Sequence, residues 1–400
     1  MASTLKIDTI TTPDGTGNIT VSRPLSGSGA SLTSLPAANL TGTLPAINGS
    51  SLTGISAQKN IIINGDFDIW QRGTSFAAAA NGTRIADRWR YLKSGAMVHT
   101  ISRDTDVPTV AESGHLSNYS LKVDCTTIDS SIAAGDYSYI EQRVEGYNFK
   151  YLAQKAMKLS FWHKHTKTGT YCVGYLNSAG DRSYVTEYTQ SVTDTWEKAE
   201  MDITASPSGG TWDYTNGIGL KVYFSIATGS SFHGTADTWE SAEDYGSSSQ
   251  VNACDNTANN FMLAQVQLEA GSVATDFEIR NHATELAMCQ RYYQKSYSTD
   301  VAPATSTTAG FVWLDGGVPG NYSADHTMVI PIRYPIKMRT SPSVTLYTSG
   351  GTSGSCNMIA GEVSGLVLYG GETGFNLQGS NGAVSIQRQL GCHYTASAEL

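Results

Sequence analysis

The chain has 400 residues, which is enough for two or three domains. Charged residues make up 15% of it, against a typical ~25%, while 40 residues are Gly and 21 are Tyr, a composition that suits a rigid extracellular β-protein better than a helical cytosolic one. A net charge of −9, with no run of Lys and Arg longer than two, argues against a nucleic-acid partner, and no apolar run approaches the ~20 residues that span a bilayer.

The cysteines are far apart in the sequence, and no two of them form a C-x-x-C pair. They are Cys125, Cys172, Cys254, Cys289, Cys356 and Cys392. Metal sites and redox dithiols need closer spacing. The N-terminus lacks the segments of a signal peptide, so we expect assembly in a reducing cytosol, where these cysteines stay free thiols.

The N-terminal segment, residues 1–29, predicts two strands joined by a turn. Apolar residues alternate from Leu5 to Ile10, Pro13-Asp14-Gly15 begins a turn, and a second strand follows around Ile19-Thr20-Val21. The phrase from Ser3 to Ile10 resembles the start of many phage fibre proteins. The resemblance implies that this end attaches to the virion, with a phage tail or baseplate protein as its partner.

Residues 30–58 are quasi-repetitive, with an aliphatic residue every three to five positions. These residues are Leu32, Leu35, Leu40, Leu44, Ile47, Leu52 and Ile55. A single extended chain has no second layer against which to bury them, but three copies around an axis do. Prolines in this stretch also lack the backbone N–H groups that a β-ladder within one chain would need. We therefore predict an intertwined, homotrimeric shaft, with a flexible Ser/Gly/Pro linker as the alternative.

The central region, residues 59–280, predicts many short strands separated by polar turns, as in an all-β sandwich. In the run Met157–His165, Leu159, Phe161 and His163 share one face and Lys158 and Ser160 the other. The predicted strands are Ile61–Asn64, Met97–Arg103, Ser120–Val123, Tyr137–Val144, Met157–His165, Tyr171–Leu176, Lys198–Ile203, Gly219–Ile226 and Met262–Leu268.

Four phrases of this region carry a family resemblance. They are the opening Asn60–Trp70, Ala86-Asp87-Arg88-Trp89, Leu159-Ser160-Phe161-Trp162 and the closing Phe261–Gly271. Together they resemble the jelly roll, similar to a carbohydrate-binding module, of phage tail fibres and receptor-binding proteins. The resemblance implies a jelly-roll domain at 59–280 whose opening and closing phrases are neighbouring strands.

The C-terminal part begins with the best helix candidate of the chain, Asn281–Tyr293, in a connecting segment 281–297. Leu286, Cys289 and Tyr293 share a helical face, and Asn281 or Thr284 could cap its start. A Ser/Thr/Ala/Pro linker, 298–310, leads to a β tip domain, 311–400, with predicted strands at Met328–Ile332, Ser343–Tyr347, Val363–Tyr369 and Val384–Gln387.

No catalytic motif is present, so we expect no enzyme activity and no cofactor. His163 and His165 lie on one strand face without a third ligand nearby, which favours structural histidines. The family resemblance implies a structural calcium between the first and last strands, where Asp66, Asp68 and Glu269 are candidate metal ligands. Calcium needs six or more oxygens, and ordinary surface carboxylates are the alternative.

Sugars bind to flat aromatic faces flanked by short polar groups. Aromatic residues in predicted loops or in the tip are therefore the candidate ligand-binding residues: Trp212, Tyr214, Trp239, Tyr245, Trp313 and Tyr322. Because fibres meet their receptor at the distal end, the tip is the preferred location.

These observations predict a structural protein of a phage virion, a homotrimeric tail fibre assembled in the bacterial cytoplasm. It would bind a host surface glycan or outer-membrane component through trimeric avidity, without catalysis and without embedding in a membrane. One alternative keeps the fold and makes the protein a capsid decoration or head fibre. The other is a polysaccharide depolymerase, since carboxylates such as Asp237, Glu240 and Glu243 crowd the long insertion Thr228–Asn260.

Overall fold

The computed structural model describes residues 59–315, 326–358, 361–381 and 389–400, which belong to one compact unit between Gly54 and Leu400. The attachment segment 1–29, the shaft 30–58 and its seven aliphatic residues lie outside the described residues. Tyr322 and the run Val384–Gln387 lie outside them as well. What the sequence predicts for these segments stays a prediction.

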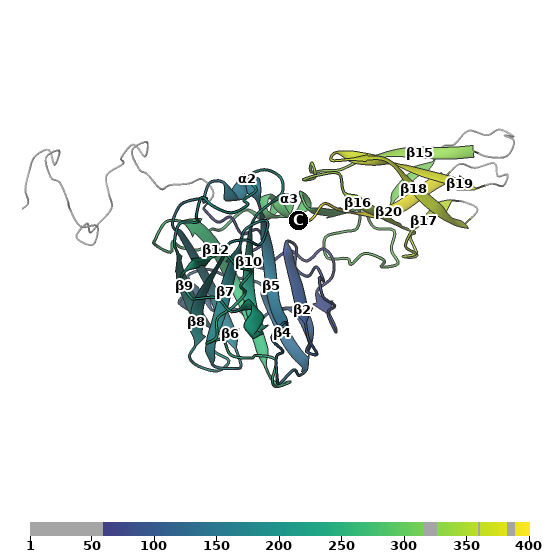
Figure 1. Ribbon diagram of the computed structural model, residues 1–400. Coiled ribbons are helices and arrows are strands. Elements are labelled where there is room, and N and C mark those ends of the chain that lie inside the picture. Colours follow the sequence, from purple (N-terminus) through teal and green to yellow (C-terminus); the bar gives the residue numbers. More distant parts are fainter. Residues whose placement is uncertain (1–58, 316–325, 359–360, 382–388) are drawn as a thin grey trace, which may run out of the picture. The chain divides into compact units, whose positions relative to one another are not determined.

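Two six-stranded antiparallel sheets form the body of the protein (Figure 1). The first contains, in spatial order, β1 (Ser75–Phe76), β3 (Val98–Asp104), β4 (Ser120–Thr127), β12 (Asn260–Ala270), β6 (Met157–His165) and β9 (Glu197–Ile203). The second contains β11 (Trp239–Glu240), β8 (Ser183–Gln190), β7 (Gly169–Leu176), β10 (Ile218–Thr228), β5 (Tyr137–Glu145) and β2 (Trp89–Ser94).

The inner faces of the two sheets pack against each other. The ring of Phe161 in β6 lies 5.2 Å from that of Phe224 in β10 and 5.0 Å from that of Tyr188 in β8, both edge-on. Residues of both sheets belong to a single buried apolar cluster. The central all-β sandwich predicted from the sequence is therefore present.

The alternation in β6 buries the predicted face. Leu159, Phe161 and His163 are buried, and the imidazole of His163 bonds the amide of Gln190 at 2.8 Å. His165 contacts the hydroxyl of Tyr188 at 3.0 Å. Burial lowers the pKa of His163 to about 4, so its ring is neutral at physiological pH. Both histidines are structural, as predicted.

The opening phrase is irregular, which corrects the prediction of a strand at Ile61–Asn64. It still lies against β12, because the Ile61 N–H donates to the carbonyl of Leu268 at 3.0 Å. Asn64 adopts a φ of 57°, accepts from the N–H of Ile69 at 3.0 Å and donates to the carbonyl of Asp87 at 3.1 Å. Local bonding by this side chain takes the place of a regular strand ladder.

The helices are short: α1 (Val110–Ser113), α2 (Gly146–Phe149), a 3₁₀ turn (Ser230–Phe232) and α3 (His282–Gln290). The predicted connecting helix is α3, and the Asn281 side chain caps it by accepting from the N–H of Ala283 at 2.9 Å. In the part of the chain that the structure describes, no helix has the length and apolarity to cross a membrane.

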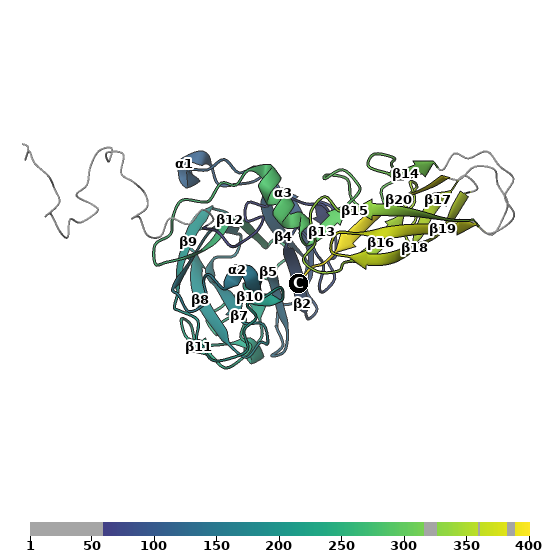
Figure 2. The ribbon, with the colours of Figure 1, turned by 90° about the horizontal axis from the view of Figure 1, so that it is seen from above.

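A third sheet forms the tip, organised around the long strand β20 (Figure 2). Its other strands are β13 (Tyr293–Lys295), β14 (Val312–Asp315), β15 (His326–Arg333), β16 (Ser343–Tyr347), β17 (Ser355–Met358), β18 (Gly361–Gly371) and β19 (Gly374–Asn381), with β20 at Gln389–Ser397. The tip has an apolar cluster of its own, which includes Leu346, Leu377, Leu390 and Tyr394.

Candidate ligand-binding site

A hollow in the tip combines an exposed aromatic ring with short polar side chains. Its volume is about 430 Å³, and it is lined by Thr308, Phe311, Trp313, Ser349, Asn357 and Met358. We refer to it as the tip hollow. Trp313 is 45% exposed, so a ligand can reach its ring.

Strand pairing builds the tip hollow from three strands that are distant in the sequence. In the sheet register, Gly391 of β20 lies opposite Trp313 of β14 on one side and opposite Asn357 of β17 on the other. Cross-strand partners point to the same face of a sheet. The tryptophan and the asparagine therefore flank a position that carries no side chain.

Gly391 is required because two rings lie over its backbone. A Cβ atom added there would collide with ring carbons of both Trp313 and Phe311. The two rings are 5.9 Å apart between centroids and are tilted by 37°. Glycine thus lets the aromatic wall approach β20 closely and leaves room beside it.

His393 holds the segment before β14 in place. Its ring is fully buried, with one nitrogen 2.9 Å from the Ser296 hydroxyl and the other 3.0 Å from the carbonyl of Thr307. The carbonyl requires a donor, so that nitrogen carries the proton. The Phe311 ring packs edge-on against the same imidazole, with 5.1 Å between centroids. Burial lowers the pKa of His393, so the ring stays neutral.

The tip hollow has the chemistry that a sugar ring requires. The Trp313 face can pack against the C–H face of a pyranose, while hydroxyl and amide groups of Thr308, Ser349 and Asn357 can pair with sugar hydroxyls. The Asn357 amide is held in place, because its oxygen accepts from the N–H of Ser349 at 2.7 Å. Its NH₂ group remains a donor that a ligand in the hollow could use.

Three of the other predicted aromatic residues pack together at the body. Trp212 stacks on the buried ring of Phe149 with centroids 5.4 Å apart, and Tyr214 stacks on the same ring at 6.3 Å. Trp239 meets Trp212 edge-on at 5.8 Å and donates its indole N–H to the carbonyl of Thr204. All three are partly buried against the main core.

Tyr245 is a core residue, which corrects its prediction as a ligand-facing loop residue. It is 6% exposed, and its ring lies 5.0 Å from that of Tyr139, 5.2 Å from that of Tyr223 and 4.5 Å from that of Phe232. The long insertion folds back over the outer face of the second sheet and buries this ring there. A polar loop can bury its aromatic residues when it packs on a sheet.

The predicted metal ligands do not meet. Asp66 and Asp68 both line a cavity of about 110 Å³, where Asp66 bonds His115 at 2.8 Å and Ser117 at 2.6 Å. Glu269 does not line this cavity. Among the described residues, no group of three or more His, Cys, Asp or Glu side chains could hold a metal ion.

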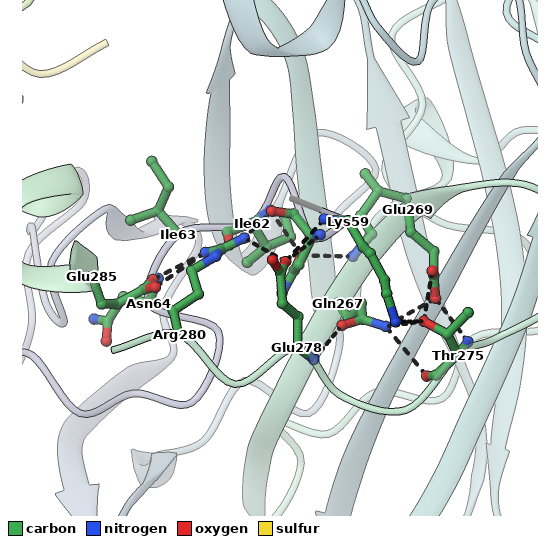
Figure 3. Close-up of polar contacts among 12 residues, drawn as sticks. Lys59, Ile62, Ile63, Asn64, Gln267, Glu269, Thr275, Glu278, Arg280 and Glu285 are labelled. Atoms are coloured by element: carbon green, nitrogen blue, oxygen red, sulfur yellow. Dashed lines mark hydrogen bonds and ion pairs between the residues drawn. The ribbon is translucent and has the colours of Figure 1, made fainter. Parts of the chain in front are cut away.

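Glu269 belongs instead to a polar network that fastens the segment after β12 (Figure 3). Its carboxylate accepts from the Thr275 N–H at 2.9 Å and from the Thr275 hydroxyl at 2.8 Å. Further along, Arg280 donates to the carbonyl of Ile62 at 3.0 Å and pairs with Glu285 at 3.1 Å. The network ties the opening phrase to the segment that leads into α3 (Figure 3).

Sequence reasoning identified Trp313 but not Phe311, Asn357 or Gly391. The tip hollow depends on the register of β14, β20 and β17, whose positions 313, 391 and 357 lie far apart in the chain. A usable signal was present in Gly391-Cys392-His393, because a glycine inside a strand often marks a close approach of other groups.

No protein-family model matches the chain, and no curated protein matches it. Similar solved structures include the enzymatically active domain of tailspike protein 4 of bacteriophage CBA120, which is 14% identical with a TM-score of 0.29 and covers 49% of this chain and 21% of its own. TmCBM61 in complex with β-1,4-galactotriose is 12% identical with a TM-score of 0.27, covering 54% and 100%.

A third similar structure contains the CBM22-1 and GH10 modules of Clostridium thermocellum xylanase 10B complexed with xylohexaose. It is 15% identical with a TM-score of 0.24 and covers 54% of this chain and 30% of its own. The chain thus spans about a fifth of the tailspike structure and under a third of the xylanase structure.

Proposed function

We propose that this chain is a virion adhesion protein of a bacteriophage, a tail fibre that binds a host surface glycan in the tip hollow. The protein would bind without chemical conversion of the glycan. Its location would be the virion tail, and its N-terminal segment would make the attachment to the particle.

The single observation that supports glycan binding most strongly is the exposed Trp313 ring beside Asn357 over the bare backbone of Gly391. This arrangement provides a flat apolar surface and a fixed amide donor in one recess. Binding sites for small ligands combine these two features.

Two features of the sequence support the adhesion role. The four phrases of the body and the phrase at Ser3–Ile10 resemble those of phage fibre proteins. The aliphatic spacing of residues 30–58 favours three copies around one axis, and three weak glycan sites on one stalk gain affinity through their high effective concentration.

A glycan array probed with the full-length chain tests the proposal. We expect binding to a small set of glycans and, for Trp313→Ala, a loss of about 30-fold in affinity per site, since a central aromatic contact is worth about 2 kcal/mol or more. Tyr369→Ala is the matched control, because Tyr369 is an exposed tip aromatic at 86% that lies outside the tip hollow. Equal glycan binding by wild type and Trp313→Ala would overturn the proposed site.

A further inference from the structure

Two exposed tyrosines and a lysine lie together on the turn that contains α2, at one end of the sandwich (Figure 1). Tyr147 is 46% exposed and Tyr151 is 63% exposed. The ammonium group of Lys150 lies 5.6 Å from the centroid of the first ring and 5.1 Å from that of the second. We call Tyr147, Lys150 and Tyr151 the tyrosine–lysine platform.

The backbone beneath the platform is fixed. The Gly146 N–H donates to the carbonyl of Gly217 at 2.9 Å, and the Tyr147 N–H donates to that of Thr215 at 2.7 Å. A Cβ atom at Gly146 would lie 2.5 Å from the carbonyl oxygen of Asp213, so the turn and the 213–217 segment are in close contact.

A buried ring anchors the platform to the core. Phe149, inside α2, is fully buried and stacks on both Trp212 and Tyr214. Leu152, just after the turn, is also buried. The backbone that carries the exposed rings is therefore anchored without a ligand, and an anchored turn loses less conformational entropy on binding than a flexible one.

The charge of the platform is not neutralised by the protein. Across the described ranges, neither Lys150 nor the exposed Lys155 forms an ion pair. Asp213, on the neighbouring turn, bonds the N–H and the hydroxyl of Thr215 at 2.6 and 2.8 Å and does not pair with Lys150. Within the described part of the chain, the Lys150 ammonium group is therefore a cation without a carboxylate partner beside two exposed rings.

Two amide residues are close to the rings in the sequence. Asn148 is half-buried in α2, and Gln154 is exposed on the following turn. Two exposed rings and an ammonium group that lies over both of them, without an ion-pair partner among the described residues, match a polymer whose sugar rings carry carboxylates.

We propose that the tyrosine–lysine platform binds an acidic polysaccharide, with uronate rings on the two tyrosines and a carboxylate at Lys150. This site is separate from the tip hollow and does not depend on the proposed function of that hollow. An exposed ion pair contributes little and is screened by salt. Each contact is therefore weak, and a polymer with many uronates binds more tightly than a short one.

Calorimetric titration of the full-length chain at low ionic strength tests this site. The probes are a galacturonic-acid oligomer and the same oligomer with its carboxylates methyl-esterified. We expect binding of the acidic oligomer, about threefold weaker binding of the ester, and weakening of the first with added salt. The variant Lys150→Gln reduces affinity for the acidic oligomer about threefold, and Tyr151→Ala, which removes a stacking ring, about tenfold. Both side chains are exposed, so the variants fold normally.

Three controls test whether binding of the acidic oligomer is specific to the platform. Lys198→Gln removes an exposed lysine elsewhere in the body and leaves binding unchanged. Trp313→Ala also leaves it unchanged, which distinguishes the platform from the tip hollow. The proposal is overturned if the wild type does not bind the acidic oligomer, if both platform variants bind it normally, or if polyglutamate of similar charge binds at the same place as tightly.

Discussion

At the scale of single residues, Gly391 decides whether the tip hollow exists. Its two cross-strand neighbours, Trp313 and Asn357, form opposite walls, and both aromatic rings of the hollow lie over its backbone. A methyl group at this position has no free space. The tip hollow is thus the consequence of one missing side chain.

Gly391→Ala should abolish glycan binding while the protein still folds. The added Cβ atom displaces the rings of Trp313 and Phe311, and overpacking of this kind costs about 1–3 kcal/mol. Gly135→Ala is the matched control, because a Cβ atom there would have no neighbour within 4 Å. Urea unfolding and glycan titration of both variants measure the two effects. Normal glycan affinity in Gly391→Ala would show that the ligand binds elsewhere.

Glu399, next to the C-terminus, connects the tip strand β20 to the body through charge. Its side chain is 5% exposed and pairs with Arg72 at 3.0 Å, with Arg84 at 3.5 Å and with Arg88. These arginines outweigh the cost of burial and lower the pKa of Glu399 to about 2. The carboxylate is therefore ionised in the folded protein at every physiological pH.

The low pKa of Glu399 predicts acid destabilisation. A carboxyl group whose folded pKa lies below its unfolded value stabilises the protein above the unfolded pKa of 4.5, and this contribution disappears as the pH falls from 4.5 towards 2. The contribution is about 3 kcal/mol. Glu399→Gln should lower the free energy of unfolding at pH 7 by about 3–5 kcal/mol, because it leaves buried arginines unpaired.

Urea unfolding of wild type and Glu399→Gln between pH 2 and 7 checks this prediction. The difference in unfolding free energy between the two proteins should shrink as the pH falls below 4.5. Glu372→Gln serves as a control, since its ion pair with Lys337 is exposed on both sides. A difference that is constant with pH would contradict the role of Glu399.

At the scale of elements, alternation of polar and apolar residues locates some strands of this chain and misses others. The predicted bounds of β6 and β16 agree with the structure, because polar and apolar residues alternate along both. The prediction missed β8, where Tyr184 and Val185 are adjacent and interrupt the alternation. It also missed β20, although Leu390, Cys392 and Tyr394 alternate with smaller or polar residues there. Whether such a run becomes a strand depends on pairing with residues distant in the sequence, which a local pattern does not contain.

Prediction of the candidate site has the same limit, because local sequence identifies single residues but not their partners in space. An exposed tip aromatic, Trp313, could be selected from its residue type and position. Its partners could not, because the tip hollow arises from the pairing of β20 with β14 and β17. For Tyr245 of the long insertion the prediction of a ligand-binding residue was wrong, because this residue lies in a polar loop but is buried in a small core.

Tyr245→Ala should therefore change stability and leave glycan binding unchanged. Removing a buried aromatic side chain costs about 3–5 kcal/mol. The exposed Trp313→Ala should show the reverse, with a large loss of binding and a small change in stability. Denaturant unfolding together with glycan titration of both variants makes the comparison. Loss of glycan binding in a folded Tyr245→Ala protein would indicate that Tyr245 belongs to the ligand-binding site.

At the scale of the whole molecule, affinity depends on how many copies of the tip act together. A single shallow hollow with one stacked ring binds weakly, whereas three on one stalk bind a dense surface far more tightly. The aliphatic spacing at residues 30–58 predicts that this segment holds the copies together.

Light scattering of the full-length chain should give the mass of three copies. Leu44→Asp should shift it towards lower mass, because the trimer would bury this side chain and an unpaired charge is costly there. Thr43→Asp adds the same charge at a neighbouring polar position and should leave the trimer intact. A wild-type mass of one chain would contradict the shaft and the gain from avidity.

The most direct test of the central claim is a crystal structure of the protein with an oligosaccharide selected on the glycan array. The account predicts a sugar ring stacked on Trp313, with hydroxyls paired to Asn357 and Thr308. Density for the sugar elsewhere on the chain, with the tip hollow empty, would contradict it.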